Sequence, residues 1–222
     1  MTPEEFITTN AALTAPPLVP EIKLYLATEV VPLWRATEEE LAEIGVPPPY
    51  WAFAWAGGQA LGRYVLDNPA VVAGKRVLDI GAGSGLVAIA AAKAGAASVL
   101  AADIDGFSCA AIRLNAAANQ CAVAATQEDL VGADSNWDVI LVGDLFYERP
   151  LAERLLAWLT PLDVLALLGD PGRSYFPKER ALKLASYSVQ TSRDLEDREI
   201  RETGVYALRD SNPAQKSGVP EP

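Results

Sequence analysis

The stretch VLDIGAGSG at residues 77–85 constrains the fold of this chain more than any other feature. It begins in a short apolar strand, RVLDI at 76–80, continues through glycines at 81, 83 and 85, and leads into a small-residue helix at 86–94. Glycine allows the sharp turn between strand and helix, and a ligand can then approach the amide groups where the helix starts. The stretch predicts a strand–turn–helix unit with a ligand site at the turn.

Strands and helices alternate along most of the chain. Apolar runs predict strands at 76–80, 97–102, 122–126, 137–143 and 163–168, with helices at 86–94, 106–119, 151–159 and 178–185. Residues 186–191 and 203–208 alternate apolar and polar side chains and predict an antiparallel pair. Parallel strands joined by crossover helices are covered on both faces. We therefore predict an α/β fold with a Rossmann-like, doubly wound, mostly parallel seven-stranded sheet, an antiparallel C-terminal hairpin and an N-terminal helical extension.

The domain organisation is expected to be simple. Residues 1–70 form an accessory segment packed on the core, with a short helix at 3–13 capped by Thr2, a period-2 run through Ile22, Leu24 and Leu26, and a glycine-opened helix that closes at Pro69. Residues 71–209 form the ligand-binding core. The last residues, 210–222, have no core pattern and are expected to be a flexible tail.

The chain contains no histidine. Ser-His and Cys-His nucleophile pairs and histidine-based zinc sites are therefore excluded. The two cysteines, Cys109 and Cys121, are too far apart for a CxxC motif, so we expect no metal site and reduced thiols in a cytoplasmic protein. Any chemistry performed here needs no histidine.

The net charge of −11 argues against nucleic acid as a partner, because a phosphate backbone is itself negative. The N-terminal residues lack the basic region of a secretory signal, and no apolar stretch approaches the length of a membrane span. A basic protein or a small molecule suits this charge better. We expect no membrane partner and a monomer.

An acidic residue, Asp103, stands at the end of the strand that follows the glycine turn, about 20 residues on. That position suits a carboxylate that accepts both hydroxyls of an adenosine ribose. A dinucleotide fingerprint would need a third glycine at position 86, where the chain has Leu86, and there is no YxxxK element. With Asp79 ahead of the glycines, the pattern favours S-adenosylmethionine over NAD(P), and over a glycine turn without a cofactor.

Several segments together carry a resemblance to a known family. VLDIGAGSG, AADID and DLFYE, with YWAFAWAGGQALGRYVLDNP ahead of the first core strand, resemble the seven-stranded S-adenosylmethionine-dependent methyltransferases. More narrowly they resemble the electron transfer flavoprotein beta-subunit lysine methyltransferase family, whose bacterial members are often labelled as ribosomal protein L11 methyltransferases. The resemblance covers about residues 47–208. The glycine turn alone indicates only the superfamily.

The resemblance implies two sets of site residues. Those that would bind the cofactor are Asp79, Gly81, Gly83, Gly85, Asp103, Ile104, Asp129, Trp55, Gln59 and Asp144. Those that would line the methyl-transfer site as catalytic residues are Asp144, Phe146 and Tyr147. Trp51 would help Trp55 and Gln59 to cover the cofactor, and either Glu128 or Asp129 would face the adenine amine.

Physical chemistry supports part of this assignment. A carboxylate at the carboxyl end of a parallel strand lies where ligands bind in such sheets, and Asp144 there can orient an ammonium group. Aromatic neighbours suit a methylated ammonium and a sulfonium through cation–π attraction. The alternatives are that Phe146 and Tyr147 pack under the next helix and that Asp144 caps a helix.

We therefore predict an S-adenosylmethionine-dependent protein-lysine methyltransferase. Its expected partner is a protein with an exposed lysine-bearing loop, the electron transfer flavoprotein beta subunit according to the resemblance. Ribosomal protein L11 or a small molecule is the alternative substrate. A nucleic-acid amine methyltransferase would need an NPPY-like element, which the chain lacks.

Overall fold

The computed structural model describes residues 1–27, 47–134, 136–191 and 200–208, and the expected tail at 210–222 lies outside them. In the described residues seven strands form one sheet in the order β5-β4-β3-β6-β7-β9-β8. They are β3 (Arg76–Ile80), β4 (Ser98–Ala102), β5 (Ala124–Thr126), β6 (Val139–Gly143), β7 (Leu165–Asp170), β8 (Ala181–Gln190) and β9 (Ile200–Leu208). The first five pair in parallel, and β9 pairs antiparallel with both β7 and β8. The predicted fold class is confirmed.

Side chains alternate strictly between the two faces of the parallel strands. In β6, Val139 and Leu141 belong to one apolar cluster, and Ile140 and Val142 belong to the other. Successive side chains of a strand point to opposite faces, and both faces are covered here, so the strand sequence is apolar throughout. The continuous run VILVG is therefore what a buried parallel strand requires.

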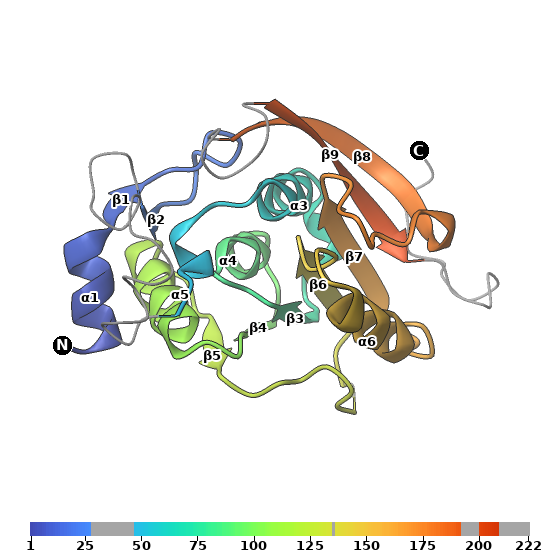
Figure 1. The fold of residues 1–222 in the computed structure, drawn as a ribbon, viewed down its shortest axis with the longest axis horizontal. Coiled ribbons are helices and arrows are strands. Elements are labelled where there is room, and N and C mark those ends of the chain that lie inside the picture. Colours follow the sequence, from blue (N-terminus) through green and yellow to red (C-terminus); the bar gives the residue numbers. More distant parts are fainter. Residues whose placement is uncertain (28–46, 135, 192–199, 209–222) are drawn as a thin grey trace.

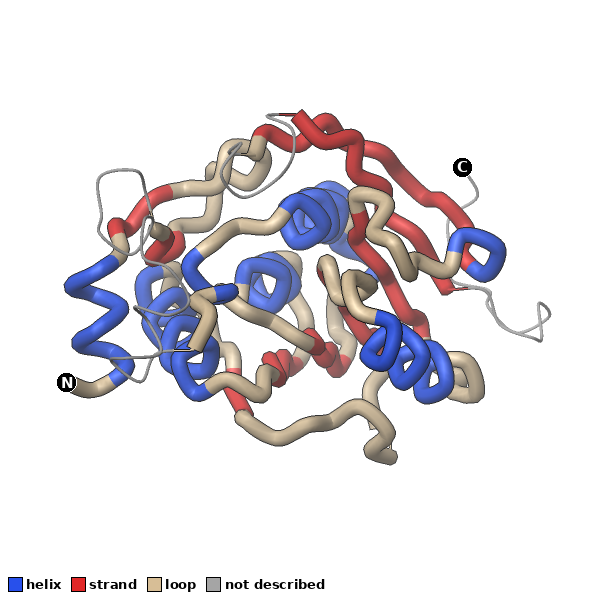
Figure 2. Tube along the Cα trace, in the orientation of Figure 1, coloured by secondary structure: helices blue, strands red, loops and turns tan. Residues whose placement is uncertain are grey.

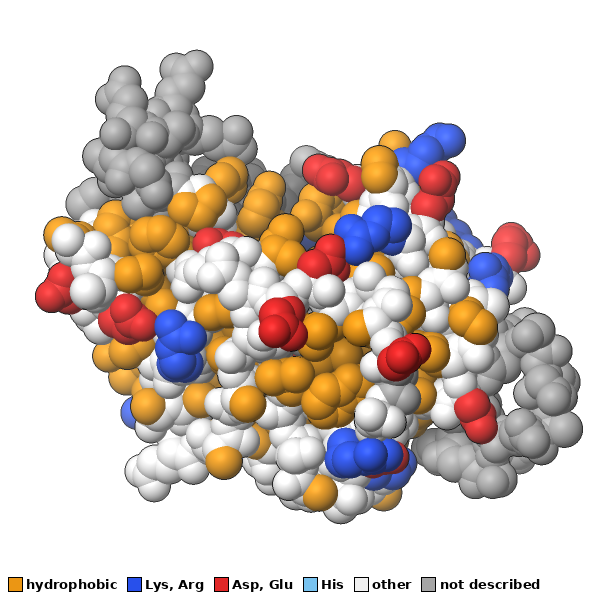
Figure 3. Space-filling model, turned by 90° about the horizontal axis from the view of Figure 1, so that it is seen from below, with side chains coloured by type: hydrophobic (Ala, Val, Ile, Leu, Met, Phe, Trp, Pro, Cys, Tyr) orange, Lys and Arg blue, Asp and Glu red, His pale blue; other side chains and the backbone are white. Residues whose placement is uncertain are grey.

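The two faces are covered unequally (Figure 1). Helices α3 (Ala56–Asp67), α4 (Leu86–Lys93) and α5 (Gly106–Ala118) pack on one face, and α6 (Arg149–Leu159) packs on the other. Apolar side chains that are only partly buried against the α6-side cluster include Leu100, Leu130, Val131, Trp137 and Leu145. Seen from below, apolar side chains gather in the middle of the surface with charged groups around them (Figure 3).

The N-terminal segment is anchored to α5 (Figure 2). Helix α1 (Pro3–Asn10) begins with the expected Thr2 cap, and Phe6 packs edge-on against Phe107 with ring centroids 5.5 Å apart. Strands β1 (Ala12–Thr14) and β2 (Leu24–Leu26) form a small antiparallel pair, and the amide of Asn115 in α5 accepts a hydrogen bond from the Tyr25 N–H at 2.8 Å. A short 3-10 helix, η2 (Tyr50–Ala52), then leads towards α3.

The predicted helix at 178–185 is wrong. The structure has a single 3-10 turn, η4 (Lys178–Arg180), and then β8, which pairs with β9 from Ala181 onward. Lys, Arg, Ala and Leu are good helix formers, so the local sequence favours a helix. Pairing with β9 along the whole strand overrides that weak preference, with a register shift between Lys183 and Ala185.

The close contact of α3 with the sheet depends on glycine at two positions. A side chain on Gly57 would meet the Gly169 carbonyl oxygen of β7, and it would lie 2.6 Å from the Oδ2 atom of Asp144. Neither of these atoms belongs to the flexible end of a long side chain, so α3 would have to move away. The start of α3 therefore rests directly on the ends of β6 and β7.

This contact leads to a test with a control in the next residue. We expect Gly57→Ala to lower the free energy of unfolding by roughly 1–3 kcal/mol, because overpacking forces the backbone to shift. In Gly58→Ala the new methyl group meets only a Val87 methyl carbon at 3.9 Å, so stability should stay the same or rise slightly. Urea unfolding of both variants measures the difference. Equal effects at the two positions would refute the close-contact argument.

Candidate functional site

The glycine turn has the sharp geometry that its sequence predicts. Gly81, Gly83 and Gly85 have φ angles of 62°, 51° and 78°, a left-handed conformation that side chains disfavour. A side chain on Gly81 would lie 2.6 Å from a Leu145 methyl carbon, whereas one on Gly83 would have no neighbour closer than 3.8 Å. The turn is thus closed on one side by the DLFY loop and open at Gly83.

Asp103 lies beside this open part of the turn. Its carboxylate accepts hydrogen bonds from the Gly83 N–H at 2.8 Å and from the Asp105 N–H at 3.0 Å. Burial raises the pKa of the Asp103 carboxyl, and the charge of Asp105 adds to the effect. A carboxylate has about four acceptor positions, so two remain for hydroxyl groups of a ligand. Ile104 beside it is 71% exposed.

Asp79 has a different environment. Its carboxyl is buried at the end of β3 and accepts a hydrogen bond from the Ala88 N–H of α4 at 2.9 Å. Burial raises its pKa to about 8, so the group is protonated at neutral pH. The structure gives Asp79 a role in fixing the start of α4 behind the glycine turn.

Asp144 links two parts of the chain. Its Oδ2 atom accepts a hydrogen bond from the Gly58 N–H of α3 at 2.9 Å, and its Oδ1 atom lies 2.7 Å from Nη2 of Arg173. The φ angle of Asp144 is 60°, a strained value for a residue with a side chain. The predicted alternative, in which Asp144 caps the helix that begins before Pro150, is wrong because Glu148 is the N-cap of α6. Asp144 instead accepts the hydrogen bond from the start of α3.

Two residues of this cluster were not identified in the sequence. The Arg173 side chain pairs with Asp144, and its guanidinium lies 5.7 Å from the ring centre of Trp55. The backbone N–H of Arg173 donates to Asp170 Oδ1 at 2.7 Å. Asp170 is 1% exposed, its Oδ2 atom has no hydrogen-bond partner, and burial raises its pKa to about 6. The available signal was the turn sequence DPG directly after an apolar strand, which places an acidic side chain at the same sheet edge as Asp144.

Two of the predicted aromatic residues, Trp55 and Tyr147, meet at the surface of this cluster through Tyr50, which was also not identified in the sequence. Tyr50 lies 6.2 Å from Trp55 and 6.4 Å from Tyr147, measured between ring centres. Partial burial is the main cause that raises the pKa of Tyr147, and the nearby Tyr50 and Glu148 raise it further. Tyr147 is 43% exposed and can contact a ligand from solution.

Two other predicted aromatic residues do not line the site. Phe146 is 1% exposed and packs edge-on against Phe176, with ring centroids 5.5 Å apart, in the core on the α6 side. Its expected place in the methyl-transfer site is corrected to packing, because neighbours in the loop point in opposite directions and Tyr147 takes the exposed one. Trp51 is fully buried in the cluster between η2, α1 and α5.

Gln59 and the residues expected near adenine have local partners. The Gln59 side chain is buried, donates to the Ala54 carbonyl oxygen at 2.7 Å and accepts from the Leu18 N–H at 3.3 Å, so it braces the segment ahead of α3. Asp129 forms an exposed ion pair with Arg154 of α6 at 2.7 Å, which lowers its pKa. Whether Asp129 or the exposed Glu128 faces an adenine stays a prediction.

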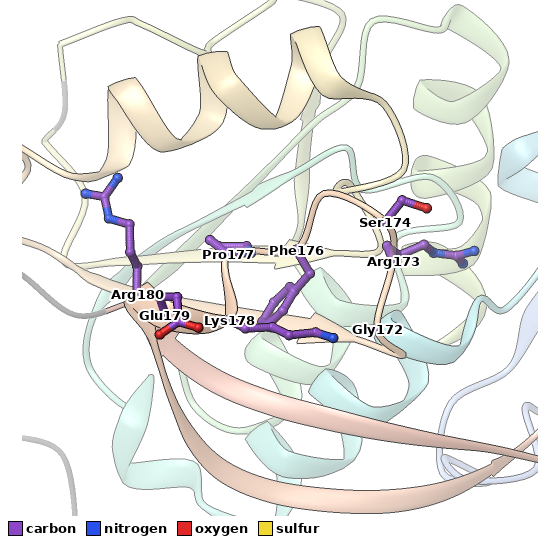
Figure 4. A pocket seen from close by; sticks show the side chains of 8 residues that line it. All are labelled: Gly172, Arg173, Ser174, Phe176, Pro177, Lys178, Glu179 and Arg180. Atoms are coloured by element: carbon purple, nitrogen blue, oxygen red, sulfur yellow. The ribbon is translucent and has the colours of Figure 1, made fainter.

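A shallow pocket of about 450 Å³ lies along residues 172–180 (Figure 4). In this view the Arg173 side chain points away from Phe176 and Lys178. Its guanidinium contacts Asp144 and Trp55. The pocket has no lining residue from the glycine turn and does not include Asp103. The open part of the glycine turn therefore lies outside this pocket.

The described residues contain neither a candidate metal site nor a helix that could cross a membrane. They contain no group of three or more side chains that could hold a metal ion. None of the helices in these parts of the chain has the length and apolar character needed to cross a bilayer.

The chain is similar in sequence to proteins of known function. It matches the model of the family described as ribosomal protein L11 methyltransferase (PrmA) over residues 60–145. It is 41% identical over 216 residues to the electron transfer flavoprotein beta subunit lysine methyltransferase of Xenopus laevis, covering 93% of this chain and 87% of that protein.

Solved structures show the same fold. The ribosomal protein L11 methylase of Lactobacillus delbrueckii subsp. bulgaricus superposes with a TM-score of 0.51 at 26% identity, over 71% of this chain and 81% of that one. Magnesium protoporphyrin IX methyltransferase of Synechocystis PCC 6803, solved with bound S-adenosylmethionine, superposes with a TM-score of 0.51 at 15% identity. The superposition covers 68% of this chain and 77% of that one.

The raised pKa of Asp79 predicts how stability depends on pH. The pKa of this carboxyl is 3.8 in the unfolded chain and about 8 in the folded protein. Unfolding between these values releases a proton, so the group makes the free energy of unfolding fall as the pH rises from about 4 to about 8. Asp79→Asn keeps an oxygen for the Ala88 N–H and carries no charge, so we expect a smaller fall between about pH 5 and pH 8.

Asp138→Asn is the control for this measurement. Asp138 forms an exposed ion pair with Arg76, which lowers its pKa to about 2. The contribution of Asp138 to stability is lost only below the pKa that its carboxyl has in the unfolded chain. The free energy of unfolding of Asp138→Asn should therefore change between about pH 5 and pH 8 as it does in the wild type. Denaturant unfolding at both pH values gives the comparison, and a wild-type slope in Asp79→Asn would contradict the burial argument.

Proposed function

We propose that this chain, which belongs to the electron transfer flavoprotein beta subunit lysine methyltransferase family, transfers methyl groups from S-adenosylmethionine to lysine side chains of the electron transfer flavoprotein beta subunit. The observation that carries this proposal is the 41% identity to the Xenopus laevis protein over nearly the whole chain. The site supports it, because the glycine turn, Asp103 and Asp144 lie along the carboxyl edge of one parallel sheet.

The residues of the turn fit S-adenosylmethionine. The left-handed glycines leave space at Gly83, in the turn that leads into α4, and this space suits the carboxylate of the methionine part. Asp103 keeps acceptor positions for the ribose hydroxyls. Bound there, S-adenosylmethionine supplies an electrophilic methyl group on a positively charged sulfur.

The chain's own residues then align the acceptor. Methyl transfer forms a bond from the lysine nitrogen to the methyl carbon as the carbon–sulfur bond breaks and sulfur keeps the electron pair. The lysine ammonium must lose its proton to water before this step, and no histidine is needed for that. We assign Asp144 to orient the amine by hydrogen bonding, and Tyr50, Trp55 and Tyr147 to line its path and attract its positive charge.

Ribosomal protein L11 is the second candidate substrate. The family model for L11 methyltransferases matches residues 60–145, which hold the cofactor elements. The match to the electron transfer flavoprotein enzyme extends over 216 residues and so includes both ends of the core. This difference in coverage favours the flavoprotein subunit, and a small-molecule substrate has no such support.

Three finer points belong to the same proposal. The chain acts on protein and not on nucleic acid or membranes, which the net charge of −11 supports. It works as a monomer. It is cytoplasmic, which the free thiols of Cys109 and Cys121 support.

The proposed activity is tested with two purified substrates in parallel. The protein is incubated with methyl-labelled S-adenosylmethionine and either electron transfer flavoprotein or ribosomal protein L11. We expect label on lysine in the flavoprotein beta subunit, identified as methyl-lysine after hydrolysis, and a much weaker signal on L11. Asp144→Asn keeps an oxygen for the Gly58 N–H but leaves the Arg173 guanidinium without its anionic partner, so this cation repels the incoming lysine. We expect the variant to bind cofactor normally and to lose at least about tenfold in rate. Label on L11 alone would overturn the substrate assignment.

The ribose assignment is tested separately by calorimetry. We expect Asp103→Ala to weaken the binding of S-adenosylmethionine at least about tenfold, since two hydrogen bonds to a charged acceptor are lost. Asp138→Ala removes an exposed carboxylate paired with Arg76 at the opposite end of the sheet and should bind as the wild type does. Unchanged affinity in Asp103→Ala would remove this residue from the ribose site.

A further inference from the structure

The ion pair between Asp144 and Arg173 raises a chemical question. A carboxylate that orients the target lysine also stabilises its protonated form, because an opposite charge at this distance favours the charged state of an amine. The protonated form has no lone pair with which to attack a methyl group. In this structure Asp144 already has a cation on its Oδ1 atom, with Nη2 of Arg173 at 2.7 Å and Nε at 3.2 Å.

The arginine is fixed on several sides. Its backbone N–H donates to Asp170 Oδ1, which holds the residue in the turn after β7. Its guanidinium lies 5.7 Å from the ring centre of Trp55, and its side chain is 19% exposed. Arginine keeps its charge at any pH that a protein tolerates. The cation therefore stays beside Asp144 through the whole working range of pH.

Other titratable groups lie around this pair or around the neighbouring Tyr147. Asp170, at the end of β7, interacts electrostatically with Asp144 and Arg173, and Tyr147, in the loop after β6, interacts with Arg173. Tyr50 from η2, Glu148 from the same loop and Asp103 from the end of β4 interact with Tyr147. Burial raises the pKa of the Tyr147 hydroxyl, so this group carries no charge at pH 7. Arg173 is thus the cation that the described residues place directly on Asp144.

We propose that Arg173 is a positioning residue that neutralises Asp144 and thereby lets the bound lysine amine lose its proton to water and act as the nucleophile. This inference rests on the proposed lysine methylation and deepens it. With Arg173 in place, an incoming amine meets a carboxylate of nearly cancelled charge that still accepts hydrogen bonds. Without Arg173, Asp144 and Asp170 together attract the ammonium form, which occupies the position of the guanidinium and reacts slowly.

The consequence is a specific kinetic pattern for Arg173→Gln. The protein substrate should bind as tightly as before or more tightly, because its lysine replaces the lost cation, so KM does not rise. The single-turnover rate near pH 7 should fall about tenfold or more, and its rising limb should move about 1 to 3 units towards higher pH. At high pH the rate should recover towards the wild-type value. A merely structural loss would lower the rate at every pH.

The experiment measures single-turnover methylation against pH with saturating cofactor and protein substrate. Arg173→Gln is compared with Arg173→Lys, which keeps the charge without the planar fork and should return the rising limb towards its wild-type position. Arg76→Gln is the matched control, because Arg76 also pairs with an aspartate through Nε and Nη2 but lies at the other end of the sheet. Its profile should be that of the wild type.

A second readout needs no activity. A carbon NMR titration of the carboxyl of Asp144 in the cofactor-free protein should give a higher pKa in Arg173→Gln than in the wild type, and no change in Arg76→Gln. A wild-type chain that methylates no lysine would overturn the proposed function and this inference with it. If the wild type is active, two results would overturn the role of Arg173 alone. One is a pH profile of Arg173→Gln that equals the wild-type profile, and the other is a rate of Arg173→Gln that is reduced equally at all pH values.

Discussion

The site depends on one kind of interaction, in which a carboxylate at or near the end of a parallel strand accepts a hydrogen bond from a backbone N–H of the adjacent turn or helix start. Asp79 accepts this bond from the Ala88 N–H, Asp103 accepts it from the Gly83 N–H, and Asp144 accepts it from the Gly58 N–H. The N-cap residues of α3 and α4 make no side-chain cap bond of their own. The strand carboxylates supply this bond instead, and a lost cap costs about 1 kcal/mol.

The same chemical group performs three different tasks because its surroundings differ. Asp79 is fully enclosed, so it keeps its proton and serves as a neutral support for α4. Asp103 retains free acceptor positions at an opening in the turn and is suited to a polar ligand. Asp144 has a fixed cation beside it and can act as a charged but compensated acceptor. The strands fix the positions of these carboxylates, and the neighbouring groups set their charge.

The sequence predicts the parts of the structure that follow from local rules. Strand β3 begins and ends where the apolar run predicts, and the glycine turn and Asp103 lie together because adjacent parallel strands end at the same edge. Local rules fail for residues 178–185, whose helical preference loses to pairing with β9. They also fail for Phe146, since a loop sequence does not show which of two neighbouring rings turns inward. The pairing of Arg173 with Asp144 spans 29 residues and has no sequence signal of its own.

The absence of side chains at two positions fixes the geometry of the whole methyl-transfer region. Because Gly57 and Gly169 have none, the start of α3 lies against β7, and Trp55, the residue before the helix, lies beside the Arg173 guanidinium. The backbone of Tyr50 is tied to the same tryptophan, whose indole N–H donates to its carbonyl oxygen at 2.9 Å. One backbone contact thus places Asp144, Arg173 and the aromatic residues beside one another. A reaction without acid–base side chains depends on alignment, and an error of about 1 Å in alignment costs on the order of a hundredfold in rate. The direct backbone contact between Gly57 and Gly169 keeps that alignment, because a side chain at either position would push α3 away from β7.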